Sequence, residues 1–140
     1  MIQFSGNEIN KIIIDWLVAW NSHDLEGVLS LLHDEIEFEN WTGVSIRGKN
    51  QLRKEWRSWF LFHGNFRFQE EDIFFDREKQ KLLLQWNLEW PSAELKYKGK
   101  IEVRRGVDVI HFMDGKILKK YSYSKTTLKI GGCMVSLSAG

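Results

Sequence analysis

The sequence predicts an α+β domain in which helices cover one side of an antiparallel sheet. Apolar residues recur with a helical period of about 3.6 up to residue 62, whereas after Gly64 they alternate as in strands. The dipeptide Asp114-Gly115 is a strong signal for a two-residue hairpin. Helices that come first, followed by strands joined by hairpins without a βαβ crossover, indicate this fold class.

Helices are predicted in three segments. In the first, from about residue 6 to 21, Ser5 and Glu8 form a capping-box pattern, and Asp24 is suited to cap a second helix. The third helix is predicted from Lys49 to Phe62. The apolar stripe of the first helix consists of Ile9, Ile12, Ile13, Trp16, Leu17 and Trp20.

Strands are predicted over residues 36–40, 65–75, 81–90, 93–105, 107–113 and 116–127, with a loop between Gly43 and Gly48. The clearest pattern lies between Lys81 and Pro91, where every second residue is apolar. With no linker or repeat, we expect one domain over residues 1–128 and a C-terminal tail over 129–140.

Length and composition exclude several classes of protein. The chain has 140 residues, 43% of them hydrophobic, and 20 Lys and Arg balance 19 Asp and Glu to a net charge of +1. This composition excludes intrinsic disorder, and the balanced charge argues against nucleic-acid or membrane-surface partners. No apolar run is long enough for a membrane span, and the start MIQFSGNEIN has no signal-peptide pattern.

Cysteine and histidine usage argues against a metal site. Cys133 is the single cysteine, so an internal disulfide is excluded. We therefore expect the protein to reside in the reducing cytoplasm. His33, His63 and His111 fall in different predicted elements without metal-ligand spacing. We therefore expect neither a metal nor another cofactor.

Three segments in order along the chain carry a family resemblance. Residues 15–28 contain a helix that ends in the corner His23-Asp24, residues 35–40 read EIEFEN, and residues 106–117 form the predicted hairpin. These segments resemble the nuclear-transport-factor-2-like superfamily, in its branch of SnoaL-like polyketide cyclases and ketosteroid isomerases. The resemblance implies a cystatin-like cone, in which a strongly curved antiparallel sheet packs on three N-terminal helices around an apolar pocket. It implies less about function, because this fold hosts enzymes, ligand binders and protein-binding modules.

The resemblance also places the catalytic positions of ketosteroid isomerases, which use an Asp base and an oxyanion site formed by a Tyr and a protonated Asp. The base position falls at Asn40, the Tyr position at Trp16 and the oxyanion Asp position at Asp108. Asn has no basic lone pair at neutral pH, and Trp offers one N–H donor and cannot relay a proton. Steroid isomerisation by the family mechanism is therefore not expected.

Asp108 is the main catalytic candidate, because it shares a strand face with Ile110 and is expected to point into the cone. A carboxyl in apolar surroundings is suited to acid–base chemistry, whereas the alternative is a structural ion pair with Lys120 or Arg105. Lys120, in turn, would supply positive charge for an anionic or carbonyl ligand.

The side of the sheet on which the charged residues lie depends on the strand register. A register shift of one residue would turn Tyr121 inward and leave Lys120 in solvent. We expect Arg104, Arg105 and Glu102 on a solvated surface of the sheet.

The walls of the pocket are expected to be mainly aromatic, and Asn40 is expected to donate a hydrogen bond to the ligand. At helical or strand spacing, such rings are also typical of an ordinary core. The predicted ligand-binding residues are Trp16, Phe38, Asn40, Trp56, Phe60 and Trp86, with Trp90 as a further wall candidate.

Two classes of function follow from these observations. The first is a pocket for a small apolar carbonyl or carboxylate compound, either a binding module or a cyclase, isomerase or dehydratase in which Asp108 and Lys120 are catalytic. The second is a protein-interaction domain whose cone is filled by its own aromatic side chains. An open cavity of several hundred cubic ångströms would favour the first class. In either case we expect a homodimer through the outer sheet face, which includes Val107, Val109 and His111.

Overall fold

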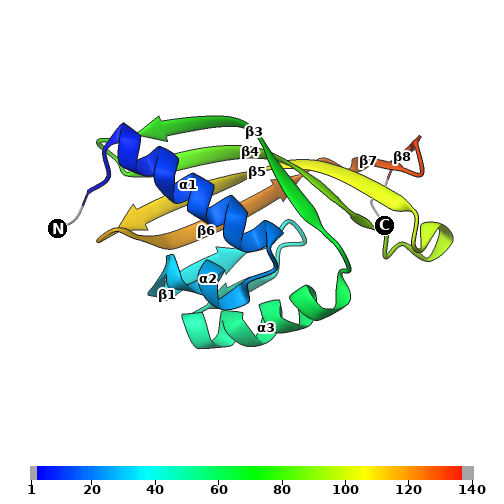
Figure 1. Ribbon diagram of the computed structural model, residues 1–140, viewed down its shortest axis with the longest axis horizontal. Coiled ribbons are helices and arrows are strands. Elements are labelled where there is room, and N and C mark those ends of the chain that lie inside the picture. Colours follow the sequence, from blue (N-terminus) through cyan, green and yellow to red (C-terminus); the bar gives the residue numbers. More distant parts are fainter. Residues whose placement is uncertain (1–2, 137–140) are drawn as a thin grey trace.

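The computed structural model describes residues 3–136 and contains three α-helices in front of one face of a mixed sheet (Figure 1). The helices are α1 (Gly6–Asn21), α2 (Leu25–Ser30) and α3 (Lys49–Phe62). The capping box is present, with Ser5 Oγ accepting from the Glu8 amide at 3.3 Å, and Asp24 Oδ1 accepts from the Gly27 amide at 2.9 Å. All three predicted helices are confirmed.

Over the described residues the sheet contains eight strands, of which six form a path in the order β2-β1-β6-β5-β4-β3. β7 adds to the first part of β5, and β8 pairs with β7. The pairs are antiparallel except that β1 runs parallel to β6. The strands are β1 (Leu32–Glu39), β2 (Ser45–Arg47), β3 (Arg67–Asp76), β4 (Lys81–Pro91), β5 (Ile101–Met113), β6 (Lys116–Ser124), β7 (Thr127–Ile130) and β8 (Cys133–Ser136).

The expected fold class is therefore confirmed, since three helices pack on a strongly curved sheet. The expected antiparallel pairing holds except between β1 and β6, which run parallel and make the sheet mixed. The strands predicted over 93–105 and 107–113 are one strand, β5, because residues 92–100 turn through the short 3-10 helix η1 (Leu95–Tyr97). That turn closes with hydrogen bonds from the Ser92 amide to Lys100 O at 2.8 Å and from the Gly99 amide to Ser92 O at 3.0 Å. The predicted loop between Gly43 and Gly48 contains the short edge strand β2.

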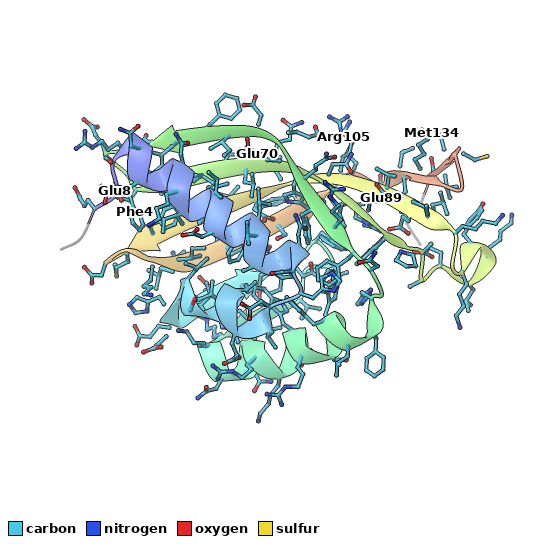
Figure 2. All side chains as sticks on the ribbon, viewed as in Figure 1. Phe4, Glu8, Glu70, Glu89, Arg105 and Met134 are labelled. Carbon is cyan, nitrogen blue, oxygen red and sulfur yellow. The ribbon has the colours of Figure 1, made fainter. Side chains whose placement is uncertain are left out.

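The end of the chain extends the sheet beyond the cone. β7 and β8, which carries Met134, form a hairpin at the opposite end of the molecule from Phe4 and Glu8 (Figure 2). The boundary predicted at residue 128 falls inside β7, and residues 137–140 of the predicted tail lie outside the described residues. None of the described helices combines the length and apolar character that crossing a bilayer requires.

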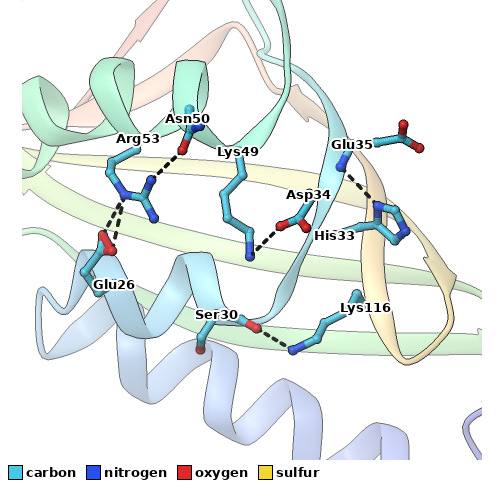
Figure 3. Close-up of polar contacts among 9 residues, drawn as sticks. All are labelled: Glu26, Ser30, His33, Asp34, Glu35, Lys49, Asn50, Arg53 and Lys116. Atoms are coloured by element: carbon cyan, nitrogen blue, oxygen red, sulfur yellow. Dashed lines mark hydrogen bonds and ion pairs between the residues drawn. The ribbon is translucent and has the colours of Figure 1, made fainter.

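A polar network attaches α2 and α3 to the first strand (Figure 3). Arg53 Nε donates to Glu26 at 3.0 Å between the two helices, and Lys49 Nζ lies 3.5 Å from Asp34 Oδ1 on β1. Lys116 Nζ donates to Ser30 O at 2.7 Å, which ties the start of β6 to the end of α2. The first two contacts link α3, which forms one wall of the site described below, to α2 and β1 at the surface.

The inner face of β4 supplies much of the core. Trp86, at its centre, is 1% exposed and lies opposite Gly106 of β5. A Cβ atom at Gly106 would stand 2.6 Å from the Trp86 ring, which is closer than van der Waals contact allows. Glycine at this position therefore leaves the space that the indole occupies. The alternating core residues of β4 are Leu82, Leu84, Trp86, Leu88 and Trp90.

Candidate functional site

A cavity of about 250 Å³ opens between α1, α3 and the inner face of the sheet. Its polar lining residues are Asn40, Thr42, Glu55, Asp108, Lys120 and Ser122. Its aromatic lining residues are Trp16, Trp20, Phe38, Trp41, Trp56, Trp59, Phe68 and Trp86. The cone is therefore not completely filled by its own side chains.

Three polar side chains from β5 and β6 form a connected cluster on the cavity floor. Asp108 and Ser122 are direct cross-strand partners, and the Ser122 hydroxyl donates to Asp108 Oδ1 at 2.7 Å. Lys120 Nζ donates to Ser122 Oγ at 2.8 Å and lies 3.4 Å from Asp108 Oδ2. Asp108 and Lys120 are 5% and 8% exposed, so the Asp108–Ser122–Lys120 cluster is a buried ion pair with a hydroxyl bridge.

The surroundings of Lys120 are aromatic as well as charged. Its Nζ lies 4.8 Å from the centroid of the Phe38 ring and 5.9 Å from that of Trp56. Burial lowers the pKa of Lys120, and the neighbouring Asp108 carboxylate opposes this effect. The lysine is thus a primary amine in a mainly apolar chamber, held by one hydroxyl and one carboxylate.

The register of β6 decides which side chains enter the cavity. Lys120 faces inward, whereas the Tyr121 hydroxyl donates to Glu37 Oε2 at 2.7 Å on the other face. Arg105, considered as a partner of Asp108, instead forms two hydrogen bonds with Glu71, at 2.9 and 2.6 Å. That alternative is wrong because Arg105 points out of the opposite face of β5.

Two indole N–H groups near the cavity have no partner. Trp20 and Trp86 both line the cavity, and the Nε1 atom of each is buried without a hydrogen bond to any residue within 3–136. A buried donor without a partner costs about 1–3 kcal/mol of stability. Such donors are expected where a ligand or an ordered water supplies the acceptor.

The cavity brings together most of the predicted site residues. Trp16, Phe38, Asn40, Trp56 and Trp86 line it together with Asp108 and Lys120. Phe60 is not among the lining residues; its ring packs behind the wall, 5.0 Å from Trp20 and 5.4 Å from Phe66. Trp90, the further candidate, belongs to a different buried cluster.

Sequence reasoning missed Trp41, Thr42 and Glu55 as lining residues. Trp41 and Thr42 lie in the turn after β1, where the Asn40 amide donates to Val44 O at 2.9 Å, and such a turn has no periodic pattern. Glu55 is exposed and next to Trp56 on α3, so its sequence position suggested only a solvated helix face. Trp20, Trp59 and Phe68 carried an apolar signal that does not distinguish a cavity wall from a core.

A second buried polar cluster lies next to the cavity. Glu102 is 1% exposed and accepts hydrogen bonds from Trp90 Nε1 and, at 3.0 Å, from Ser92 Oγ. Arg104 Nε lies 3.3 Å from Glu102 Oε2, and its guanidinium carbon lies 4.9 Å from the Trp41 ring centroid. The predicted solvated positions of Glu102 and Arg104 are therefore wrong, because both face the inner side of β5.

His63 covers the outer edge of this second cluster. Its ring stacks on Trp90 and on Trp59, with 4.8 Å between ring centroids in each case. Burial lowers the pKa of His63, and the Glu102 carboxylate opposes this effect. The described residues contain no group of three or more His, Cys, Asp or Glu side chains placed to hold a metal ion.

Comparison with known proteins identifies both a family pattern and a shared fold. The family model described as a SnoaL-like domain matches residues 13–119. A search of the curated proteins finds no match.

Three solved structures have a similar fold. TerC, co-crystallised with polyporic acid, is 16% identical, with 84% of this chain and 91% of that chain covered at a TM-score of 0.70. An NTF2-like protein of unknown function from Exiguobacterium sp. 255-15 is 18% identical, with 81% of this chain and 98% of that chain covered at a TM-score of 0.68. An LEH-like epoxide hydrolase from M. tuberculosis is 18% identical, with 82% of this chain and 80% of that chain covered at a TM-score of 0.67. At these identities the likeness concerns the fold alone.

Proposed function

The chain belongs to the family of SnoaL-like domains, and we propose that its cavity binds a small, largely apolar molecule that carries a carbonyl or carboxylate group. The observation that carries this proposal is the buried Lys120 ammonium on the floor of a mostly aromatic chamber, together with two lining residues, Trp20 and Trp86, whose buried indole N–H groups have no partner among the described residues. A ligand oxygen would accept from the ammonium or from an unpartnered indole, while the rings would cover the apolar part of the ligand.

The size and charge of the site support a small ligand with an electron-rich oxygen. Its volume of about 250 Å³ is close to the lower end of the range of roughly 300–1,000 Å³ for ligand pockets. The Lys120 ammonium favours an anion or a polarised carbonyl over a neutral hydrocarbon. TerC, which shares the fold, was co-crystallised with polyporic acid.

A catalytic role follows from the same geometry. An ammonium beside a carbonyl oxygen stabilises the negative charge that develops when a proton leaves the adjacent carbon. Asp108 is the carboxylate within 3.4 Å of that ammonium and would exchange the proton, through Ser122 or a water. Proton transfer of this type is the chemistry of isomerases, cyclases and dehydratases. Asn40, at the base position of steroid isomerases, cannot serve in that role.

Binding is tested with two probes that share a ring system. We expect 2-naphthoate to raise the melting temperature and to quench tryptophan fluorescence with saturation, whereas 2-methylnaphthalene, which lacks an acceptor, does so far less. In Lys120→Met the difference between the two probes should become much smaller, because the ammonium is its main cause and only the indole donors remain. Equal responses of the wild-type protein to both probes would contradict the proposal.

The second candidate function is homodimerisation through the outer sheet face, with the protein in the cytoplasm. This face carries Val107 and Val109 on β5, together with Tyr123, which is 52% exposed. The exposed thiol of Cys133 fits a reducing compartment. Light scattering at micromolar concentration should give the mass of a dimer, and Val109→Lys should give a monomer. A monomeric wild-type mass would exclude the dimer.

A further inference from the structure

We propose that Lys120 is a covalent site: its Nζ forms a Schiff base with an aldehyde or ketone that enters the cavity. This inference rests on the proposed function, because it names the carbonyl class of ligand and adds a bond to the same site. It assigns a nucleophile to a chain whose sequence shows no nucleophilic motif.

The first step of the argument is the position of the amine. Lys120 lines the cavity, and its Nζ lies 4.8 and 5.9 Å from the ring centroids of Phe38 and Trp56, which line it too. Lys120 is also the one lysine among the cavity's lining residues within the part of the chain described. The two rings contact each other edge to face, with 5.2 Å between their centroids, so a flat carbonyl compound packed against them in the cavity would place its carbonyl carbon close to a primary amine.

The second step is the state of the amine. A lysine is nucleophilic only as the free amine, and desolvation among apolar groups increases the free fraction at a given pH. Burial lowers the pKa of Lys120, although the nearby Asp108 carboxylate opposes this effect. A cavity that releases its water when it binds an apolar ligand strengthens the desolvation.

The third step is the movement of protons, for which the Asp108–Ser122–Lys120 cluster contains the groups needed. The free amine of Lys120 attacks the carbonyl carbon, and one of its two N–H protons passes to Asp108 Oδ2, 3.4 Å away, and from there to the carbonyl oxygen, which gives the carbinolamine. The second N–H proton follows the same route to the new hydroxyl, which leaves as water and gives the neutral imine. The balance is one amine plus one carbonyl compound, giving one imine and one water, with no oxidant or reductant required.

Ser122 positions the two partners during these transfers. Its hydroxyl accepts from Lys120 Nζ at 2.8 Å and donates to Asp108 Oδ1 at 2.7 Å. Once the Lys120 nitrogen has become an imine nitrogen, the Ser122 hydroxyl can donate either to that nitrogen or to the Asp108 carboxylate. Ser122 is a positioning residue in this scheme, not the nucleophile.

The experiment traps the imine by reduction. The wild-type protein is incubated with 2-naphthaldehyde in less than molar equivalence, reduced with sodium borohydride, digested and mapped by mass spectrometry. We expect the naphthylmethyl group on Lys120, with at least about tenfold more label there than on Lys119, its neighbour on the outer face. Addition of 2-naphthoate should suppress this label, because both compounds occupy the cavity.

Two matched variants accompany the wild-type map. Lys120→Arg keeps the positive charge but has no primary amine of this kind, so the cavity label should be lost, while Lys119→Arg should retain it. Because the label is located on the wild-type protein itself, the test does not depend on either variant folding normally.

The possible results separate the two proposals. If 2-naphthoate binds with saturation but the label follows general lysine exposure, the Schiff base is overturned and the binding function stands. If label on Lys120 persists in excess 2-naphthoate, the cavity-bound imine is also overturned. If neither compound binds or labels, both proposals fail.

Discussion

The ammonium of Lys120 lies 3.4 Å from the carboxylate of Asp108, with the two side chains 10% and 7% exposed. Neither charge has free access to water, so each depends on the other and on the Ser122 hydroxyl between them. A buried pair of this kind contributes less to stability than its Coulomb energy suggests, because both ions lose hydration.

Breaking this pair on one side should destabilise the fold. Lys120→Met should lower the free energy of unfolding by about 3–5 kcal/mol, because the Asp108 carboxylate remains buried without its cation. The double variant Lys120→Met/Asp108→Leu should recover most of this loss in urea unfolding. As a control, Arg53→Met, which breaks an exposed pair, should cost no more than about 1 kcal/mol. Wild-type stability of Lys120→Met would show that the two charges are not coupled.

Trp86→Phe should separate ligand binding from stability. The substitution removes an indole N–H without a protein partner, so the loss of ring volume is partly offset by relief of an unsatisfied donor. We expect the affinity for 2-naphthoate to fall about tenfold, the equivalent of one hydrogen bond of roughly 1.4 kcal/mol. Isothermal titration with the same compound measures the change. Unaltered affinity would mean that Trp86 Nε1 does not contact the ligand.

Asn40→Asp should introduce a base that the wild-type cavity lacks at this position. A carboxylate at residue 40, on the cavity lining, can accept a proton from the carbon next to a bound carbonyl. We expect exchange of deuterium into 2-tetralone, followed by NMR, to be faster than with the wild-type protein by about 10²-fold or more. The variant Asn40→Leu serves as the control, since it removes the amide without adding a base. Equal rates in Asn40→Asp and Asn40→Leu would exclude residue 40 from the reacting centre.

His63 should make stability depend on pH. Its pKa is lowered in the folded protein from the ordinary value of 6.5, so below 6.5 the unfolded chain binds the proton first. Stability is therefore complete above pH 6.5 and decreases as the pH falls from 6.5 toward the lowered pKa. Melting temperatures between about pH 5 and 8 should show a steeper decrease for the wild-type protein than for His63→Phe, which keeps the stacking on Trp90. Parallel curves would contradict this assignment.

Gly106→Ala should be poorly tolerated although it adds one methyl group. The new Cβ would stand 2.6 Å from the Trp86 ring and would also clash with the Tyr123 carbonyl. We expect a loss of about 1–3 kcal/mol in urea unfolding, from displacement of the indole or the strand. The same shift should reduce 2-naphthoate binding. Gly6→Ala, where nothing lies within 4 Å of the added Cβ, is the matched control and should retain both.

The helices and the central strands could be predicted because their signals are local. The capping box at Ser5, the stripe on α1 and the alternation along β4 all lie within single elements. The parallel pairing of β1 with β6 could not, because pairing between distant strands leaves no local period. The buried positions of Glu102 and Arg104 were missed for a related reason: two charged residues on one strand face indicate solvent unless their partners are known.

The site was predictable in its charged centre but not in its rim. Asp108 was found because it shares a strand face with Ile110 and falls at the oxyanion Asp position that the resemblance implies. Lys120 was found as its neighbour across the Asp114-Gly115 hairpin, so its inward position depended on the register there. Trp41 and Glu55 complete the cavity from a turn and from an exposed helix position. Only tertiary packing brings those positions to the cavity.

The parallel pairing of β1 with β6 has a consequence for biosynthesis. β1 ends at Glu39, whereas β6 begins at Lys116, so the ribosome must synthesise most of the chain before this partner emerges. Until then the tryptophans of α1 and α3 have no completed sheet to cover them. Their exposed apolar surface therefore promotes association between nascent chains. Folding should accordingly be slow and largely post-translational. The yield of folded protein in cells should therefore depend on the supply of chaperones as well as on the stability of the folded state.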